Sequence, residues 1–188
     1  ARFTLTRALE AKAADLRDAA ASRAFRQLVL DGGWQVAPDW AHPHVFEPGA
    51  YPAPAGSRYG GRYDFPKHFY PVIADLKDGG EEFLCAQLID MHPKVKHWVR
   101  NLVGAPAGFG LPTSRHWFYA DFVAELVDGR VGLLEYKGAH LANDPGELEK
   151  RQVGELWARA SDGRAVFGWL MHTQQGLSLS QQLDQVLA

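Results

Sequence analysis

The spacing of apolar and polar residues changes along the chain, and the changes predict its elements. In residues 6–30, Leu9, Ala13, Leu16 and Ala20 recur at helical spacing with charged residues between them. This pattern favours one long amphipathic helix or two shorter ones. In residues 34–57, prolines, glycines and aromatic residues replace any helical period. We expect a loop or an edge hairpin there, which could include a strand at residues 34–36.

From residue 80 onward, helical and extended patterns alternate. Asp144, Pro145 and Glu147 form a typical helix start, since proline suits the first turn and acidic residues favour the N-terminal end. The continuous apolar run at residues 165–171 is typical of a buried strand. The pattern predicts helices at 80–91, 145–160 and 178–187, strands at 95–103 and 165–171, and a hairpin at 116–137. This order indicates an α/β fold, with a mixed central sheet flanked by helices.

Composition limits the class of protein. The chain has 188 residues, 46% of them hydrophobic and 22% charged, which is enough for one well-packed domain. We expect residues 1–57 to form a helical and loop extension that packs on a core domain of residues 58–188. No apolar run of about 18 residues occurs, so we expect no membrane span. The single cysteine, Cys85, excludes an internal disulfide and a multi-cysteine metal site, and favours a cytoplasmic location.

Three residues in the 116–137 hairpin carry the candidate chemistry. Asp121 lies in the YADF segment of the first strand, and the second strand is an apolar run that ends in Glu135 and Lys137. Residues two apart on a strand point to the same face, so Lys137 would lie beside a cation held by Glu135. Magnesium prefers oxygen ligands and commonly takes one or two carboxylates, which Asp121 and Glu135 could supply. The spacing therefore predicts a metal-dependent nuclease site in which Lys137 positions water and offsets charge on a phosphate.

The register of the hairpin decides whether Asp121 shares a face with the Glu-x-Lys step. A strict two-residue turn at Asp128 and Gly129 would place Asp121 opposite Tyr136, on the wrong face. A three-residue loop, or a bulge near Asp121, would place it opposite Lys137. We therefore expect an irregularity in this hairpin.

The order acid, hairpin, Glu-x-Lys resembles the PD-(D/E)xK nuclease superfamily, with Ala120 where many members have proline. A broader resemblance covers about residues 59–170. It runs through RYDFPKHFYPVIADL, GGEEFLCAQLIDMHPKVKHWVRNL, LPTSRHWFYADF, LLEYKGAHL and EKRQVGELWA. Together these segments resemble the C-terminal endonuclease domain of type III restriction Res subunits. The resemblance implies a restriction-endonuclease-like core.

The resemblance also suggests further site residues. A helical glutamate upstream of the hairpin matches Glu82, which shares a helix face with Cys85 and Ile89 and should point inward. Glu81 is the second choice for this role, and both glutamates could instead complement the helix N-terminus. The carbonyl of Tyr136 would be a further metal ligand. Gln152, on the helix after the motif, is a candidate DNA contact.

The implied activity is hydrolysis of DNA phosphodiester bonds with Mg²⁺, for which Mn²⁺ could substitute. The implied partners are DNA, a modification subunit, and a helicase-like ATPase motor in the same polypeptide, because this sequence has no phosphate-binding P-loop motif. The net charge of −2 argues against strong DNA binding by this domain alone. Basic residues that could contact phosphates cluster at 58–68, 94–100 and 150–151. His116 and His140 flank the motif.

Two other interpretations remain open. The domain could keep the nuclease fold as an inactive DNA-binding or interaction module. Alternatively, the Asp and Lys of the motif could form an ordinary surface ion pair, which stabilises a protein by about 0–1 kcal/mol.

Overall fold

Four strands form the central sheet, in the order β1-β4-β5-β6. A computed structural model describes residues 2–104, 108–138 and 144–188 of the chain. Strands β1 (Val95–Arg100), β4 (Phe122–Leu126) and β5 (Val131–Lys137) are antiparallel neighbours, and β6 (Ala165–Met171) runs parallel to β5. The sheet is therefore mixed, and the predicted α/β fold with a mixed central sheet is confirmed at this level.

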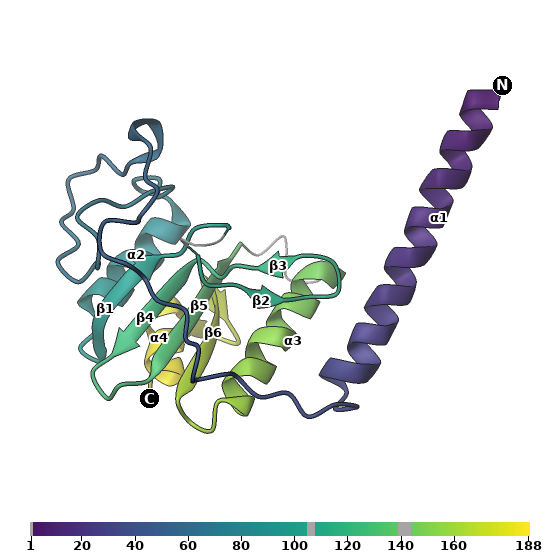
Figure 1. Cartoon of the computed structure of the whole chain (residues 1–188). Coiled ribbons are helices and arrows are strands. Elements are labelled where there is room, and N and C mark those ends of the chain that lie inside the picture. The colour runs from purple at the N-terminus through teal and green to yellow at the C-terminus, as the bar shows by residue number, and fades with distance from the viewer. Residues whose placement is uncertain (1, 105–107, 139–143) are drawn as a thin grey trace.

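Helices cover both faces of the sheet (Figure 1). Helices α2 (Glu81–Met91) and α4 (Leu179–Val186) pack on the face that carries Phe122 and Leu134. Helix α3 (Pro145–Ala160) packs on the opposite face, which carries Val123 and Leu133. Successive strand residues point to opposite faces, so each strand contributes to both cores.

Helix α3 begins and ends where the sequence predicts. Asp144 caps it, and its side chain accepts hydrogen bonds from the backbone N–H groups of Gly146 and Glu147. Farther along, Gly154 lies so close to β6 that a Cβ atom there would be 2.4 Å from the ring of Phe167. The glycine therefore allows α3 to approach the sheet closely.

The start of the predicted hairpin differs from the expectation. Strand β3 (Trp117–Phe118) pairs with β2 (Leu111–Pro112) in a separate two-stranded ladder, so residues 116–118 do not extend β4. A second small ladder joins β7 (Thr173–Gln174) to β8 (Leu177–Ser178), just before α4. Ser178 caps α4 in a capping box with Gln181.

The N-terminal region forms one long helix, α1 (Arg2–Phe25), which continues into a π-helical turn, η1 (Arg26–Leu30). Figure 1 shows α1 projecting away from the sheet and helices. Leu5, Leu9 and Leu16 on this helix are about three-fifths exposed, at 63, 62 and 59%. The helix is present as predicted, but its leucines do not lie in a core.

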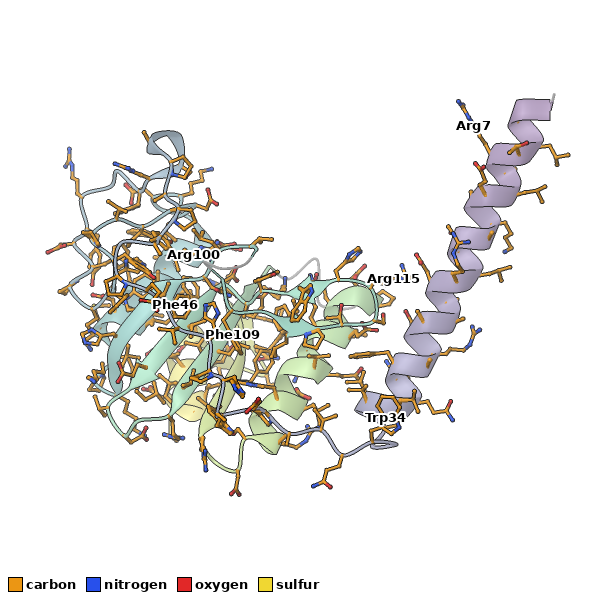
Figure 2. The ribbon with its side chains drawn as sticks, in the orientation of Figure 1. Arg7, Trp34, Phe46, Arg100, Phe109 and Arg115 are labelled. Carbon is orange, nitrogen blue, oxygen red and sulfur yellow. The ribbon has the colours of Figure 1, made fainter. Side chains whose placement is uncertain are left out.

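The second half of α1 contacts the β2–β3 turn. Arg115 Nη1 lies 3.5 Å from Asp18 Oδ2, and the hydroxyls of Ser22 and Ser114 are 3.0 Å apart. Figure 2 shows Arg115 beside α1 at this turn, whereas Arg7 lies far along the projecting helix.

Residues 31–54 follow an irregular path across the sheet (Figure 1). The strand considered at residues 34–36 does not form, and Trp34 is exposed. A short 3₁₀ turn, η2 (Ala55–Ser57), precedes the core segments. Within the described ranges, none of the helices combines the length and hydropathy needed to cross a membrane.

Candidate active site

The β4–β5 hairpin has the expected irregularity. The backbone N–H of Leu126 donates to the carbonyl of Arg130 at 2.9 Å, so that pairing continues past the strand ends and leaves a three-residue loop, 127–129. Gly129 in this loop adopts a φ of 88°, which glycine tolerates without strain. Because Phe122 pairs with Leu134, continuing the register by one residue places Asp121 opposite Glu135. The two acids therefore lie at the same level of the sheet, although the sequence expectation had placed Asp121 opposite Lys137.

Hydrogen bonds join the two acids directly. The backbone N–H of Asp121 donates to Glu135 Oε2 at 2.9 Å, and the backbone N–H of Tyr136 donates to Asp121 Oδ2 at 2.8 Å. In an extended strand the N–H and C=O of one residue point toward the same neighbouring strand, so the Tyr136 carbonyl also faces the Asp121 side. The three residues thus meet where β4 begins and β5 ends.

Lys137 occupies the same end of the sheet. Its Nζ lies 2.7 Å from Glu135 Oε1 and 2.7 Å from Glu147 Oε2, and it lies over the ring of Trp169 at 5.5 Å from the centroid. Glu147 belongs to the first turn of α3, and it also pairs with Lys150 at 2.6 Å. The parallel β5–α3–β6 arrangement therefore brings the start of α3 to the lysine of the motif.

Arg100, at the end of β1, connects the acids to helix α2. Its Nη1 lies 3.0 Å from Asp121 Oδ1, and its Nη2 lies 2.5 Å from Glu82 Oε2. Arg100 is 8% exposed, and its guanidinium lies 5.1 Å from the centroid of the Phe122 ring. Glu82 is therefore connected to Asp121 by way of Arg100. Its side chain is 43% exposed, whereas the sequence expectation was that it points inward.

Asn101, the residue after Arg100, holds the backbone that carries Asp121. Its backbone N–H donates to the carbonyl of Asp121 at 2.9 Å, and its side-chain amide donates to the carbonyls of Ala120 and Phe109. Its side-chain oxygen accepts from the N–H of Phe109 at 2.9 Å. A buried amide with this many partners fixes the position of the 120–121 backbone.

Glu135 is nearly inaccessible, at 4% exposure. Burial, and then the charge of Asp121, raise the pKa of Glu135 to about 8, and the salt bridge with Lys137 only partly offsets these effects. Burial also opposes the charge on Lys137, but Glu135 and Glu147 more than compensate, so the pKa of Lys137 is raised. The buried carboxyl of Glu135 beside the partly buried Asp121 therefore favours a nearby cation at this position.

The pKa values of Glu82 and Glu147, the acids at the two sides of the site, shift in opposite directions. Burial, and then Asp121, raise the pKa of Glu82 despite its contact with Arg100. Burial would also raise the pKa of Glu147, but hydrogen bonds from Lys137 and Lys150 lower it overall. The cluster combines four carboxylates with three basic groups, and its members are Glu82, Asp121, Glu135, Glu147, Arg100, Lys137 and Lys150.

The donor atoms suit a hard divalent cation. Asp121 and Glu135 bring carboxylate oxygens to one place, and strand geometry turns the Tyr136 carbonyl toward the same side. Among the described residues, no group of three or more His, Cys, Asp or Glu side chains is arranged to hold a metal ion. Magnesium commonly takes only one or two carboxylates and keeps several waters. The set therefore fits a site with two carboxylates.

The remaining predicted residues lie apart from this cluster. Gln152 accepts a hydrogen bond from Arg26 of η1 at 3.1 Å, on the side of α3 that faces the N-terminal region. Glu81 is exposed on α2, and its side chain interacts with the Tyr136 hydroxyl rather than joining the cluster through Arg100 as Glu82 does. His116 is exposed in the β2–β3 turn, and His140 lies outside the described residues.

Three residues that the sequence grouped in basic clusters are buried or paired in the structure. Arg100 is buried in the site, and His68 is buried beside it. His68 Nε2 accepts from the backbone N–H of Arg100, and Nδ1–H donates to the Tyr70 carbonyl. Lys96 pairs with Glu125 at 2.8 Å. The sequence missed Arg100, Asn101 and Glu147 as site residues; only Glu147 had a local signal, its place in the first turn of α3.

An apolar pocket of about 920 Å³ lies elsewhere, between residues 36–46, the sheet and α3. Phe46, Phe109 and Trp157 contribute to its lining, whereas Asp121 and Glu135 do not. Figure 2 shows Phe46 and Phe109 over the sheet. The mainly apolar lining lacks the convergent carboxylates of the sheet end, so the sheet end is the better candidate for hydrolytic chemistry.

Comparisons with models of protein families, with curated proteins and with solved structures find no match for this chain.

Proposed function

We propose that this chain is a metal-dependent DNA endonuclease domain with a restriction-endonuclease-like fold, similar to the nuclease part of type III restriction Res subunits. The observation that carries the proposal is the convergence of Asp121, Glu135 and Lys137, which the sequence motif requires. The Asp121 N–H contacts Glu135 Oε2 at 2.9 Å, and Lys137 Nζ contacts Glu135 Oε1 at 2.7 Å. The mixed sheet that holds them is compatible with the proposed fold.

Each residue has a distinct task in the proposed reaction. Asp121, Glu135 and the Tyr136 carbonyl would hold the cation. A bound Mg²⁺ supplies a Lewis acid for the phosphate and lowers the pKa of a bound water. Lys137, an ammonium placed beside Glu135, orients the attacking water and offsets negative charge that develops on the phosphate. Glu147 holds Lys137 from the other side and so limits its motion.

The proposal includes the setting in which such a domain acts. DNA is the substrate, a helicase-like ATPase in the same polypeptide moves it, and a modification subunit provides sequence specificity. The single cysteine, Cys85, supports a cytoplasmic location for this activity. One site cuts one strand, so a double-strand break would need two copies, two visits or a partner.

One observation favours a second candidate, an inactive nuclease-fold module that binds DNA or another partner. Each carboxylate oxygen of Asp121 and Glu135 already has an N–H or ammonium partner, namely Tyr136 N, Arg100, Asp121 N and Lys137. These contacts neutralise the acids without a metal. The two candidates differ in whether a divalent cation can replace some of these contacts.

Cleavage of supercoiled plasmid with Mg²⁺ or Mn²⁺ tests the proposal. Wild type should nick the plasmid, and Asp121→Ala and Lys137→Ala should lose at least about 100-fold of the rate, as removal of a group that stabilises the transition state does. Lys96→Ala is the matched control, because Lys96 is an exposed lysine whose salt bridge with Glu125 lies outside the site. It should retain the wild-type rate.

The outcomes separate the two candidates. Nicking by wild type that both site substitutions abolish supports the endonuclease. If wild type and Asp121→Ala both fail to cleave and both fail to bind Mn²⁺ in calorimetry, the inactive module is the better description.

A further inference from the structure

Arg100 is the central cation of the candidate site, although it does not belong to the motif that identified the site. Its two terminal nitrogens contact acids from different elements, Glu82 on α2 and Asp121 before β4. Nη1 also donates to the Asp121 carbonyl at 3.3 Å. One guanidinium therefore bridges two carboxylates that would otherwise repel each other.

The surroundings of Arg100 restrict the position of its side chain but do not use all of its hydrogen-bond donors. The side chain is buried and lies over Phe122. Among the described residues, its Nε has no hydrogen-bond partner. An unpaired donor on a buried, charged group is costly, so the observed arrangement leaves Arg100 one interaction short of full satisfaction.

The guanidinium of Arg100 lies where it would compete with a divalent cation for the carboxylate of Asp121. Asp121 Oδ1, which Arg100 contacts at 3.0 Å, belongs to a carboxylate in the proposed metal-ligand set. A divalent cation and a guanidinium repel each other, and both are attracted to the same carboxylate. Binding of the cation would therefore weaken the hold of Asp121 on Arg100.

We propose that Arg100 exchanges partners during the reaction: it bridges Glu82 and Asp121 when no divalent cation is bound, and binds a non-bridging oxygen of the substrate phosphate when the cation is present. This inference rests on the proposed function and adds to it a substrate-binding residue. A guanidinium offers several N–H donors in a planar fork, which matches the oxygens of a phosphate.

Charge balance supports the exchange. The cluster of four carboxylates and three basic groups has a formal charge of −1 when all are ionised, and of 0 when Glu135, whose pKa is about 8, is protonated. A divalent cation makes the cluster positive, and a phosphodiester then brings the compensating negative charge. The metal-free cluster, which is neutral or negative, would not attract DNA, whereas the metal-loaded cluster would attract it.

Two binding measurements on Arg100→Gln test the inference. Calorimetry with Mn²⁺ should give a Kd about tenfold lower than that of wild type, because the competing charge is gone. Fluorescence anisotropy with a short duplex DNA in Ca²⁺ should give a Kd about tenfold higher, because the phosphate contact is gone. Lys96→Gln, which removes an exposed positive charge from the same strand, should change neither by more than about twofold.

The opposite signs distinguish the proposed role from a structural one. If Arg100 only holds the fold, Arg100→Gln should weaken both cation and DNA binding. Unchanged or weaker Mn²⁺ binding, or unchanged DNA binding in Ca²⁺, would overturn the inference while leaving the endonuclease proposal to its own cleavage assay. Failure of wild type and Arg100→Gln alike to bind Mn²⁺ would remove both proposals.

A measurement on the wild-type protein covers the case in which Arg100→Gln does not fold. In a proton–nitrogen NMR spectrum, the Arg100 Nε–H signal, assigned through Arg100→Lys, should shift as Mg²⁺ is added. The Nε–H signal of Arg130, which pairs with Asp128 at 2.8 Å outside the site, should stay in place. A fixed Arg100 signal at saturating Mg²⁺ would contradict the exchange.

Discussion

Replacing Glu135 by glutamine should make the metal-free protein more stable. The buried carboxyl has a pKa of about 8 in the folded chain, against an ordinary value of 4.5, because it is buried and faces Asp121. A folded-state pKa above the unfolded one means that the stability present at low pH is lost as pH rises between these two values. Each pH unit in this window lowers the free energy of unfolding by about 1.4 kcal/mol.

At pH 7 the loss is therefore about 3 kcal/mol, and Glu135→Gln should recover up to that amount. The amide is neutral at every pH, and its oxygen can still accept from the Asp121 N–H. At pH 5, which is only half a unit above the ordinary pKa of 4.5, the gain should fall below about 1 kcal/mol. Activity should be lost in the same variant, as expected when a residue is kept for function at a cost in stability.

Denaturation by urea in a chelating buffer, followed by circular dichroism at both pH values, measures the gain. Glu125→Gln is the matched control, since Glu125 is a half-exposed glutamate on β4 that pairs with Lys96. It should change the free energy of unfolding by less than about 1 kcal/mol. A Glu135→Gln protein that is less stable than wild type at pH 7, or equally stabilised at pH 5 and pH 7, would refute the reasoning.

Three further predictions concern the fold. Burial lowers the pKa of His68 in the folded chain to about 4, from an ordinary value of 6.5. As pH falls from about 6.5 to about 4, the unfolded chain takes up a proton at this histidine that the folded chain does not, so about 3 kcal/mol of stability should be lost. His68→Gln should flatten this part of the curve of unfolding free energy against pH. Leu134→Ala, at a fully buried position, should cost about 2–5 kcal/mol in urea denaturation, whereas Leu9→Ala on the exposed helix should change stability by less than about 0.5 kcal/mol. Gly154→Ala should cost about 1–3 kcal/mol through its clash with Phe167, and adding Phe167→Leu should recover part of the loss in thermal melts.

The elements that the sequence predicted well are those with strong local signals. Helix α3 begins at Pro145 behind the Asp144 cap, and β6 coincides with the apolar run at residues 165–171. The strand considered at residues 34–36 had no such signal, and none forms there. Residues 117–118 have a strand pattern, but their partner is β2, which the sequence did not identify. Local periodicity specifies an extended segment and does not specify its neighbour.

In the candidate site, too, the sequence predicted the features that have local signals and missed those that depend on packing. The Asp-Gly turn and the alternation of β5 predicted an irregular hairpin, and the three-residue loop puts Asp121 level with Glu135. Arg100 gave no such signal, because in sequence it is one of several basic residues near the end of β1. Its burial between Glu82 and Asp121 depends on how α2 and β1 pack at the sheet end.

The sequence by itself determined the class of fold, the ends of its best-marked helices and the spacing of Asp121, Glu135 and Lys137. These depend on side-chain period, capping and turn chemistry, which act over a few residues. Only the tertiary structure decided which charges surround the motif. Glu147 reaches Lys137 because β5 and β6 are parallel and the intervening α3 starts at the end of β5. Contacts between residues distant in sequence come from the packing of whole elements, and no local pattern encodes them.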